Sequence, residues 1–305
     1  MKTVAGMLCL AGILSLGMGT TVFAEDGDSH YPVTITTYNY ENEPIEMTFE
    51  KAPEKVFAYA NSNIEELLAL GLGDKIVAAC GLDGDVREDL KDEFDKIQYM
   101  DTKPSKEEVV AMEPDFIAAW YSSFDDDWLS DVSFWQERDV NTYMSLNSAA
   151  KGPASEFPRT IEDEYEDILN LGKIFDCEDK AEEIVDQMKG EIDKVKEHVE
   201  GTDPLSVAVL EDEGDSFRVY GTETLGGNIP ETLGAELKLG AENSENVGAE
   251  DLIAADPDVL FMINYDGFMT ADEAIADITD NPAYASLSAV KNNKVFSVNL
   301  NEVYC

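Results

Sequence analysis

Short hydrophobic runs alternate with amphipathic stretches along this chain, and the two patterns predict different elements. The runs at 56–60, 76–81 and 207–210 are apolar at successive positions and predict buried strands. The stretches at 157–175 and 178–199 instead place apolar residues at helical spacing along one face. This alternation of strands and helices is typical of an α/β fold.

One local pattern occurs twice, once around Pro114 and once around Pro257. Each copy reads as a short helix, a Pro-Asp turn and an apolar run, and aligning the prolines superposes Glu107 on Glu250. The proline ends the helix because it forces the preceding residue out of the helical region. The apolar run is too continuous for a half-exposed strand, so it predicts a parallel sheet covered on both faces. Two copies therefore predict two similar Rossmann-like lobes with parallel-rich sheets, and two lobes usually enclose a cleft.

The remaining stretches complete these lobes. Residues 61–63 predict an N-terminal cap for a helix over 64–70, which Gly71 ends. The other predicted elements are a β-hairpin at 33–49, an acidic loop and helix at 83–98, helices at 128–138, 226–233 and 271–279, and strands at 141–145, 217–220 and 295–298.

The helix predicted over 178–199 has no internal proline. At 1.5 Å per residue it spans about 33 Å, enough to cross behind both lobes as a single stiff connection. A surface helix within one lobe is the alternative that periodicity leaves open.

The first 24 residues have the pattern of a secretory signal. One positive charge precedes a long apolar stretch that closes with Val22-Phe23-Ala24, a small-x-small cleavage pattern. A membrane anchor is the alternative, and Cys9 lies too near the start for convincing lipid attachment. We therefore expect an exported chain with an N-terminal lobe at 25–155, a helical region at 156–200 and a C-terminal lobe at 201–305.

Composition narrows the partners. The formal charge of −44 repels nucleic acid and anionic membrane surfaces, and it keeps an exported protein in solution. The mature chain would retain Cys80, Cys177 and Cys305, an odd number whose spacing matches neither a disulfide framework nor a zinc motif.

In their order and spacing, these segments resemble the class III, helical-backbone substrate-binding proteins of ABC importers. The resemblance covers nearly the whole mature chain. It rests on the opening hairpin, Lys55-Val-Phe-Ala-Tyr59, Asn63-Ile-Glu-Glu-Leu67, both helix-Pro-Asp-strand units and the Asp179-Lys-Ala-Glu-Glu183 start of the long helix. Members of this family carry ferric siderophores, haem or cobalamin. The resemblance thus implies a monomer that binds a metal chelate between its lobes and delivers it to the importer permease.

The same resemblance bears on two features of the chain, the residues that would contact the permease and the C-terminal end. In the family, a surface glutamate on each lobe seats against arginines of the permease, and Glu107 and Glu250 occupy the matching positions. Ordinary helix-start chemistry is the alternative, since Ser105 and Glu108 form a capping box there. Members also usually continue past the last strand into a closing helix. Because this chain ends at Cys305, we expect a C-terminal lobe that is truncated or completed in another way.

Ligand-binding residues are expected in the loops at the carboxyl ends of the strands, the general site of open α/β sheets. Aromatic side chains are frequent in these loops, and flat rings offer a large contact area to a bulky chelate. Packing in the core is the alternative for each ring. The candidates are Tyr59, Asn61, Asp83, Lys103, Trp120, Tyr121 and Phe124 on the first lobe, and Arg218, Tyr220, Tyr265 and Phe268 on the second.

The charge of these loops bears on the ligand. An anionic catecholate complex would favour several basic residues, and the candidates include two, Lys103 and Arg218. Acidic segments also lie close by in the sequence, at 83–85 and 125–127. A neutral or cationic ligand is favoured, such as a hydroxamate-type ferric complex or a cobamide. Because His30 and His198 are the two histidines of the chain, a bare divalent metal is not expected. No cofactor is expected.

Two other classes of function compete with this interpretation. A secreted hydrolase would need a recognisable catalytic motif, and the sequence contains no Gly-x-Ser-x-Gly, P-loop or His-Glu-x-x-His. A calcium-stabilised acidic surface or adhesion module is the other possibility, although the segments at 83–89 and 125–131 lack a full calcium-loop pattern.

Overall fold

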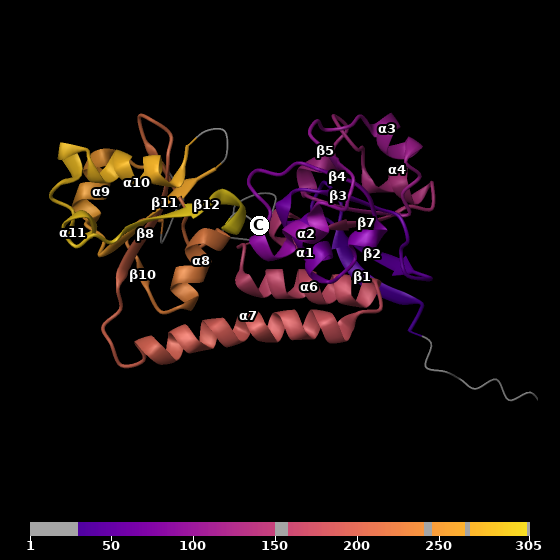
Figure 1. Cartoon of the computed structure of the whole chain (residues 1–305), viewed down its shortest axis with the longest axis horizontal. Coiled ribbons are helices and arrows are strands. Elements are labelled where there is room, and N and C mark those ends of the chain that lie inside the picture. The colour runs from indigo at the N-terminus through magenta and orange to yellow at the C-terminus, as the bar shows by residue number, and fades with distance from the viewer. Residues whose placement is uncertain (1–29, 150–157, 241–245, 266–268, 304–305) are drawn as a thin grey trace, which may run out of the picture. The chain divides into compact units, whose positions relative to one another are not determined.

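The computed structural model describes residues 30–149, 158–240, 246–265 and 269–303. The chain divides into two units, Met1–His30 and Tyr31–Cys305, and the elements below all belong to the second (Figure 1). The predicted signal segment lies outside the described residues. Within the described part of the chain, no helix has both the length and the apolar character needed to cross a membrane.

An antiparallel hairpin opens the second unit, with β1 at Val33–Tyr38 and β2 at Pro44–Phe49. Alternate side chains on both strands are buried, as expected for strands with one face on a core. The Thr37 hydroxyl accepts a hydrogen bond from the Met144 N–H at 3.1 Å. The predicted hairpin is therefore confirmed and is tied to the first lobe.

The N-terminal lobe is built on a parallel sheet with the strand order β5-β4-β3-β6-β7. The strands are β3 (Val56–Tyr59), β4 (Ile76–Cys80), β5 (Tyr99–Met100), β6 (Phe116–Ala119) and β7 (Asn141–Met144). The helices are α1 (Asn61–Ala69), α2 (Lys91–Phe94), α3 (Lys106–Ala111), α4 (Val132–Gln136) and α5 (Leu146–Ala149), with 3-10 turns η1 (Gly73–Lys75), η2 (Glu88–Leu90) and η3 (Tyr121–Ser123). Every residue of β6 is buried, which confirms a central strand covered on both faces.

The C-terminal lobe has a second sheet with the parallel order β10-β8-β11-β12, and β9 is antiparallel to β8. The strands are β8 (Ser206–Asp212), β9 (Phe217–Val219), β10 (Glu236–Leu237), β11 (Val259–Asn264) and β12 (Val295–Asn299). The helices are α8 (Leu225–Thr232), α9 (Ala249–Ala255), α10 (Ala271–Thr279) and α11 (Ser288–Lys291), with η4 (Pro282–Tyr284) and η5 (Leu300–Glu302).

Two helices follow the N-terminal lobe: α6 (Ile161–Ile174) and the 22-residue α7 (Glu178–Val199). Gly172 lets them approach closely, because a Cβ at this position would lie 2.5 Å from the Cβ of Ala181. Beyond this contact α7 runs on beneath the second lobe, past α8 and toward β10 (Figure 1). The single long helix predicted between the lobes is therefore confirmed.

Direct contacts also join the lobes at α8. Leu225 is buried in the same hydrophobic core as the N-terminal sheet. The Ile161 N–H donates to the Asn228 side-chain oxygen at 3.0 Å, and the Asn301 amide donates to the Asp85 carbonyl at 3.4 Å. These contacts bring α8 against the start of α6, and η5 against the first-lobe loop that carries Asp85.

The two helix-Pro-Asp-strand units have the same sequence of exposed and buried positions over 106–117 and 249–260. In each unit the residue before the proline, Glu113 or Asp256, has a positive φ (53° and 41°). The proline therefore turns the preceding residue out of the helix in both lobes, as predicted.

Some predicted boundaries are wrong. Helix α1 begins at Asn61, with Ala60 at its N-cap and no side-chain cap, so 61–63 do not cap it. The helix expected over 128–138 is reduced to α4, because the Ser123 carbonyl and Asp125 hold residues 128–130 in a turn. The helix expected over 157–175 begins only at Ile161, because Thr160 and Asp163 form a capping box there, and residue 157 lies outside the described residues.

Candidate functional site

Three aromatic rings meet at the carboxyl ends of the N-terminal strands. Tyr59 ends β3, and its ring centroid lies 6.2 Å from that of Trp120, which follows β6, and 4.7 Å from that of Trp128. Both contacts are edge-to-face, the arrangement favoured by aromatic quadrupoles. We call Tyr59, Trp120 and Trp128 the aromatic wall. Tyr59 and Trp120 were predicted as site residues, whereas Trp128 was not.

Gly81, directly after β4, makes room for this wall. It has a φ of +87°, and a Cβ built on it would lie 2.2 Å from Cε2 of Tyr59. The next residue is also fixed, because the Leu82 N–H donates to the Tyr99 hydroxyl at 3.1 Å. A side chain at position 81 would therefore collide with the Tyr59 ring.

Asn61 supports the site rather than lining it. Its side chain is buried, its oxygen accepts a hydrogen bond from the Asp83 N–H at 2.7 Å, and its amide donates to the Gly84 carbonyl at 3.5 Å. Asn61 thus holds the loop that carries Asp83, which is exposed. Although Asp83 reaches solvent, partial desolvation by the surrounding loop raises the pKa of its carboxyl group, and burial together with the Asp83 charge raises the pKa of Tyr59.

Lys103 brings a positive charge to the wall. Its Nζ lies 3.6 Å from the centroid of Trp128 and 5.5 Å from that of Tyr59, which is cation–π geometry. Burial lowers the pKa of Lys103. The ammonium group is therefore held over the rings, where it can meet an acceptor oxygen of a ligand.

The remaining N-terminal candidates have different surroundings. Tyr121 is half-buried and stacks on Tyr40 of the hairpin turn, with centroids 6.2 Å apart. The Trp120 indole N–H donates to the Ser62 hydroxyl at 3.1 Å, which fixes the ring. Phe124 is completely buried in the hydrophobic core. It offers no surface to a ligand, so the prediction for this residue is corrected.

Fewer of the C-terminal candidates are accessible. Tyr220 is 1% exposed and its hydroxyl donates to Glu211 at 2.9 Å, so its role is packing and this prediction is also corrected. Arg218 is half-buried, lies 3.7 Å from Glu211 and faces the Tyr220 ring at 5.4 Å. Tyr265 is half-buried at the end of β11. Phe268 lies outside the described residues.

The predicted docking residues occupy equivalent places. Glu107 and Glu250 are exposed in the first turns of α3 and α9. In α3 the expected capping box is present, because Ser105 accepts from the Glu108 N–H and Glu108 accepts from the Ser105 N–H. Glu108 thus has a structural task that Glu107 does not share.

A cavity of about 500 Å³ opens between α1, α6, α7 and η5. Its lining includes Glu66 and Glu164, and the Glu66 Oε2 is buried without a hydrogen bond among the described residues. Burial raises the pKa of Glu164 to about 6 and that of Glu66 well above its ordinary value. The neighbouring Asp167 accepts hydrogen bonds from the Tyr143 hydroxyl at 2.5 Å and the Leu146 N–H at 2.9 Å. Sequence reasoning missed this cluster, because acidic residues are too abundant in the chain to single any out.

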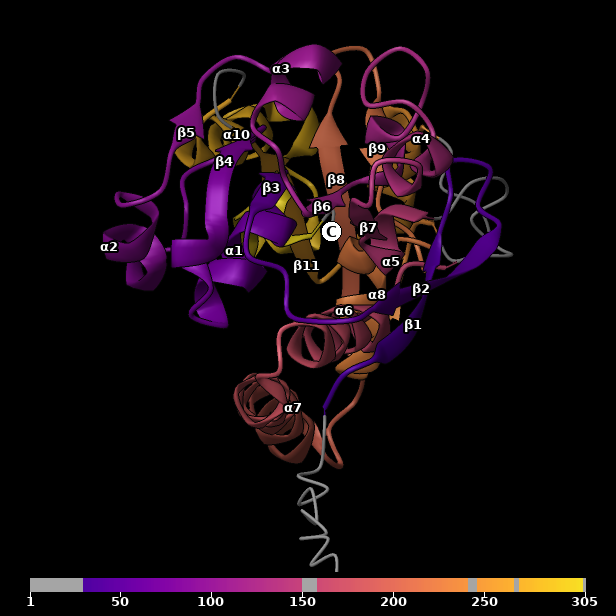
Figure 2. The same cartoon turned by 90° about the vertical axis from the view of Figure 1, so that its right-hand side faces the viewer.

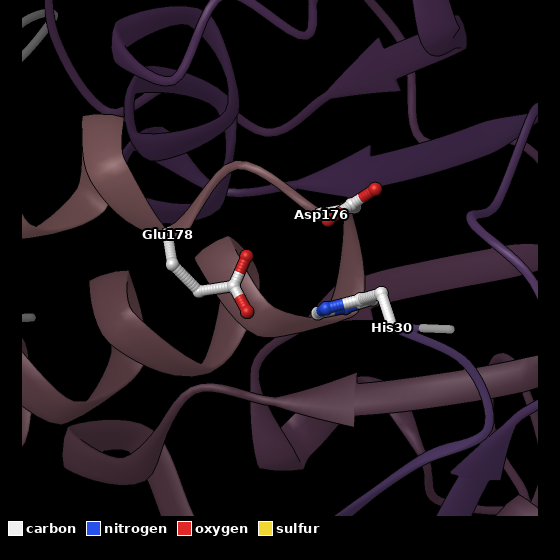
Figure 3. Close-up of side chains that lie close together, drawn as sticks. All are labelled: His30, Asp176 and Glu178. Carbon is white, nitrogen blue, oxygen red and sulfur yellow. The ribbon is translucent and has the colours of Figure 1, made fainter. Parts of the chain in front are cut away.

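The turn before α7 carries two more carboxylates. Asp176 and Glu178, labelled in Figure 3, flank the N-terminus of this helix. Burial and their negative charges raise the pKa of Tyr31 to about 12. The Tyr31 hydroxyl donates to the Ile174 carbonyl at 2.8 Å, so this turn is a structural junction between the first strands and the long helices.

Comparisons with known proteins agree with this architecture. The family profile described as periplasmic binding protein matches residues 56–299. The uncharacterized ABC transporter substrate-binding lipoprotein YvrC of Bacillus subtilis (strain 168) is 24% identical over 310 residues, covering 98% of this chain and 90% of its own. The petrobactin-binding protein YclQ of the same organism is 24% identical over 256 residues, covering 80% of this chain and 74% of its own.

Solved structures give the same result. A periplasmic binding protein from Veillonella parvula DSM 2008 superposes with a TM-score of 0.83 at 33% identity, covering 90% of this chain and 86% of the other. The ABC-type Fe3+-hydroxamate transport system from Saccharomonospora viridis DSM 43017 superposes with a TM-score of 0.70 at 24% identity, covering 90% and 93%. The second likeness concerns the fold alone.

Proposed function

Because the chain belongs to the periplasmic binding protein family, we propose that it captures a ferric chelate of the siderophore type outside the cytoplasm and delivers it to an ABC importer. Its relatives are substrate-binding proteins of ABC transporters, so the chain is a binding protein and not an enzyme. Membership of this family argues against the two alternatives considered from the sequence, a secreted hydrolase and a calcium-stabilised surface module. Export after cleavage near Ala24, a monomeric state and the absence of a cofactor remain parts of the proposal.

The aromatic wall is the observation that carries the choice of ligand. Tyr59 and Trp120 are half-buried and present ring surface at the carboxyl ends of parallel strands, where open α/β sheets bind their ligands, and the buried Trp128 supports them from behind. Lys103 sits over these rings and can meet a chelate oxygen, while the exposed Asp83 disfavours a strongly anionic complex. A neutral or cationic ferric hydroxamate fits this combination, and a cobamide is the second ligand to test.

Relatives support the iron assignment. Curated relatives named for petrobactin and Fe(3+)-citrate binding are 24% and 25% identical to the chain. Delivery needs a contact with the permease, and we assign that contact to Glu107 on α3 and Glu250 on α9. Exposed carboxylates in a first helical turn can accept paired hydrogen bonds from arginine.

Titration with candidate chelates tests the proposal. Quenching of tryptophan fluorescence would be followed with a ferric hydroxamate, a ferric catecholate, haem and cyanocobalamin, each beside its metal-free form. A ligand at one hundred times its dissociation constant should add about 2.7 kcal/mol to the free energy of unfolding. Trp120→Ala should weaken the binding at least tenfold, whereas Phe296→Ala, which removes an exposed ring from β12, should not. Absence of saturable binding by every chelate would overturn the proposal.

A further inference from the structure

The cavity between α1, α6, α7 and η5 contains two acceptor oxygens that lack a donor. Glu66 on α1 and Asn301 on η5 both line it, and the Glu66 Oε2 and the Asn301 Oδ1 are buried without a hydrogen bond among the described residues. The Asn301 amide nitrogen donates to the Asp85 carbonyl at 3.4 Å, so the oxygen is the side of this amide that lacks a partner. Buried acceptors are nearly always hydrogen-bonded in folded proteins. The pair therefore indicates a ligand that brings donors into the cavity.

The buried acids of the cavity also lack a counter-charge. Burial is the main cause that raises the pKa of the Glu66 carboxyl, and the charges that add to it are acidic, chiefly those of Asp167 and Glu164. Water supplies hydrogen bonds but no charge, and a retained proton removes the charge but leaves a hydroxyl that again needs a partner. An ammonium group supplies both, since it carries one positive charge and three N–H donors.

The basic side chains that line the cavity are already paired. The Arg87 guanidinium lies 2.7 Å from the Asp89 carboxylate, and the Lys180 ammonium lies 2.9 Å from the Glu183 carboxylate. Both pairs are exposed to solvent, whereas the Glu66 carboxyl is buried. A bound cation would supply the positive charge that this carboxyl lacks.

The lining favours an organic cation over a metal ion. No three carboxylates of the lining, all of which belong to described residues, bring their oxygens within 4.8 Å of one another, as a shared metal ion would require. The cavity holds about 500 Å³, whereas one water molecule occupies about 30 Å³. Apolar side chains from α1, η2, α6, α7 and α8 complete the lining and suit an alkyl chain: Ala69, Leu90, Ile168, Ile184, Met188 and Leu225.

Carboxyl groups line this cavity at two depths. Those of Glu66 and Glu164 are desolvated by burial, whereas Glu191 and Glu302 are exposed. We propose that the cavity binds an organic diammonium ion, an alkyl chain with a protonated amine at each end. The inner amine donates to Glu66, Glu164 and the Asn301 oxygen, and the alkyl chain lies along the apolar side chains. The outer amine meets the exposed carboxylates.

This site is separate from the aromatic wall, so the inference goes beyond the proposed capture of a chelate. Of the described residues that line the cavity, none belongs to the wall. In Figure 1 and Figure 2, α6 and α7 lie on the lower side of the molecule, beneath α1. The lining comes from both lobes, because α1 belongs to the first and η5 to the second. A bound diamine should therefore raise the melting temperature.

Calorimetric titration with 1,5-diaminopentane at pH 7 tests the site. The unaltered protein should bind one diamine per chain, and 1-aminopentane, with a single amine, at least about tenfold more weakly. Glu66→Gln and Glu164→Gln should each weaken diamine binding at least about tenfold, whereas Glu162→Gln, at an exposed position of α6, should not. Ala69→Leu fills the apolar part of the cavity without changing a charge and should also weaken binding. Circular dichroism would confirm that each variant is folded.

Four results would overturn the inference. The first is the absence of saturable diamine binding by the unaltered protein, and the second is equal binding by Glu66→Gln. Loss of diamine binding in Trp120→Ala would place the amine on the aromatic wall. Displacement of the diamine by stoichiometric Mg²⁺ or Ca²⁺ would identify a metal site instead. None of these measurements uses a chelate, so a failure of the proposed function is seen separately, in the fluorescence titration.

Discussion

Asp115 and Asp258 perform the same structural task in the two lobes. The Asp115 carboxylate accepts hydrogen bonds from the Lys55 N–H at 2.8 Å and from the Glu54 N–H at 3.0 Å, just before β3 begins. The Asp258 carboxylate accepts from the N–H of Ser206 at 3.0 Å and from its hydroxyl at 2.7 Å, at the start of β8. The aspartate after each proline therefore fixes the strand that pairs beside its own. This task explains why the Pro-Asp turn recurs.

Removing either carboxylate should destabilise its lobe. Asp115→Ala leaves two backbone donors without their acceptor, and hydrogen bonds to charged groups contribute about 1.5–3 kcal/mol each when well formed. Because the site is half-exposed and water can replace the carboxylate, we expect a loss of about 1–2 kcal/mol in urea unfolding. Asp126→Ala, an exposed aspartate in the acidic loop, is the control. Equal stability of the two variants would contradict the assignment.

Gly81 and Gly71 provide a matched pair for testing the aromatic wall. Both have positive φ, +87° and +80°, so alanine costs each a similar backbone strain of about 1 kcal/mol. A Cβ at Gly71 meets open space, whereas one at Gly81 strikes the Tyr59 ring. Gly81→Ala should therefore weaken chelate binding at least tenfold in the fluorescence titration, and Gly71→Ala should leave it unchanged. The wall would lose its proposed role if both variants bound as tightly as the unaltered protein.

Elements that depend on local pattern could be predicted from the sequence. The hairpin, the strand after each Pro-Asp turn and α7 follow from periodicity, apolar runs and proline, all of which act between near neighbours. The helix predicted over 271–279 matches α10 at both ends, because the capping box of Thr270 and Glu273 fixes its start.

Site residues depend on packing between distant segments, which periodicity does not report. Phe124 and Tyr220 follow strands as cleft residues do, yet both rings turn into a core. Trp128 lies in a turn after an acidic loop and reaches the wall because its indole N–H donates to the Pro104 carbonyl at 2.6 Å. Asn61 supports a loop and does not face a ligand, because a buried amide needs hydrogen-bond partners and the backbone of the loop at Asp83 supplies them.

The buried carboxyl groups beside the cavity should make stability depend on pH. Burial raises the pKa of Glu164 from 4.5 to about 6, so the folded protein keeps a proton that the unfolded chain releases. This contribution is fully present below about pH 4.5 and is lost as the pH rises through about 6. Glu164→Gln removes the cost of ionising the group and should gain on the order of 1–2 kcal/mol at pH 7.

The control for this prediction lies on the same helix. Glu162→Gln also removes one negative charge from α6 but at an exposed position. Urea unfolding at pH 4.5 and pH 7 should give a smaller difference for Glu164→Gln than for the unaltered protein, and an unchanged difference for Glu162→Gln. Parallel behaviour of the two variants would mean that general charge repulsion, rather than the buried carboxyl, governs the pH dependence.

Ligand binding should close the lobes only slightly. The described chain passes from the first lobe to the second through α7, and a continuous helix bends little because each turn is held by its own hydrogen bonds. The hydrogen bonds from Ile161 to Asn228 and from Asn301 to Asp85 add direct contacts that a wide opening would break. Small-angle scattering should therefore give nearly equal radii of gyration with and without the chelate.

A proline in the long helix tests the same role of α7. Lys189→Pro should interrupt α7 and widen the range of distances between the lobes in solution, while each lobe keeps its own fold. The control Lys189→Ala should leave the helix continuous. A large ligand-dependent closure of the unaltered protein would contradict the role of α7 as a stiff connection.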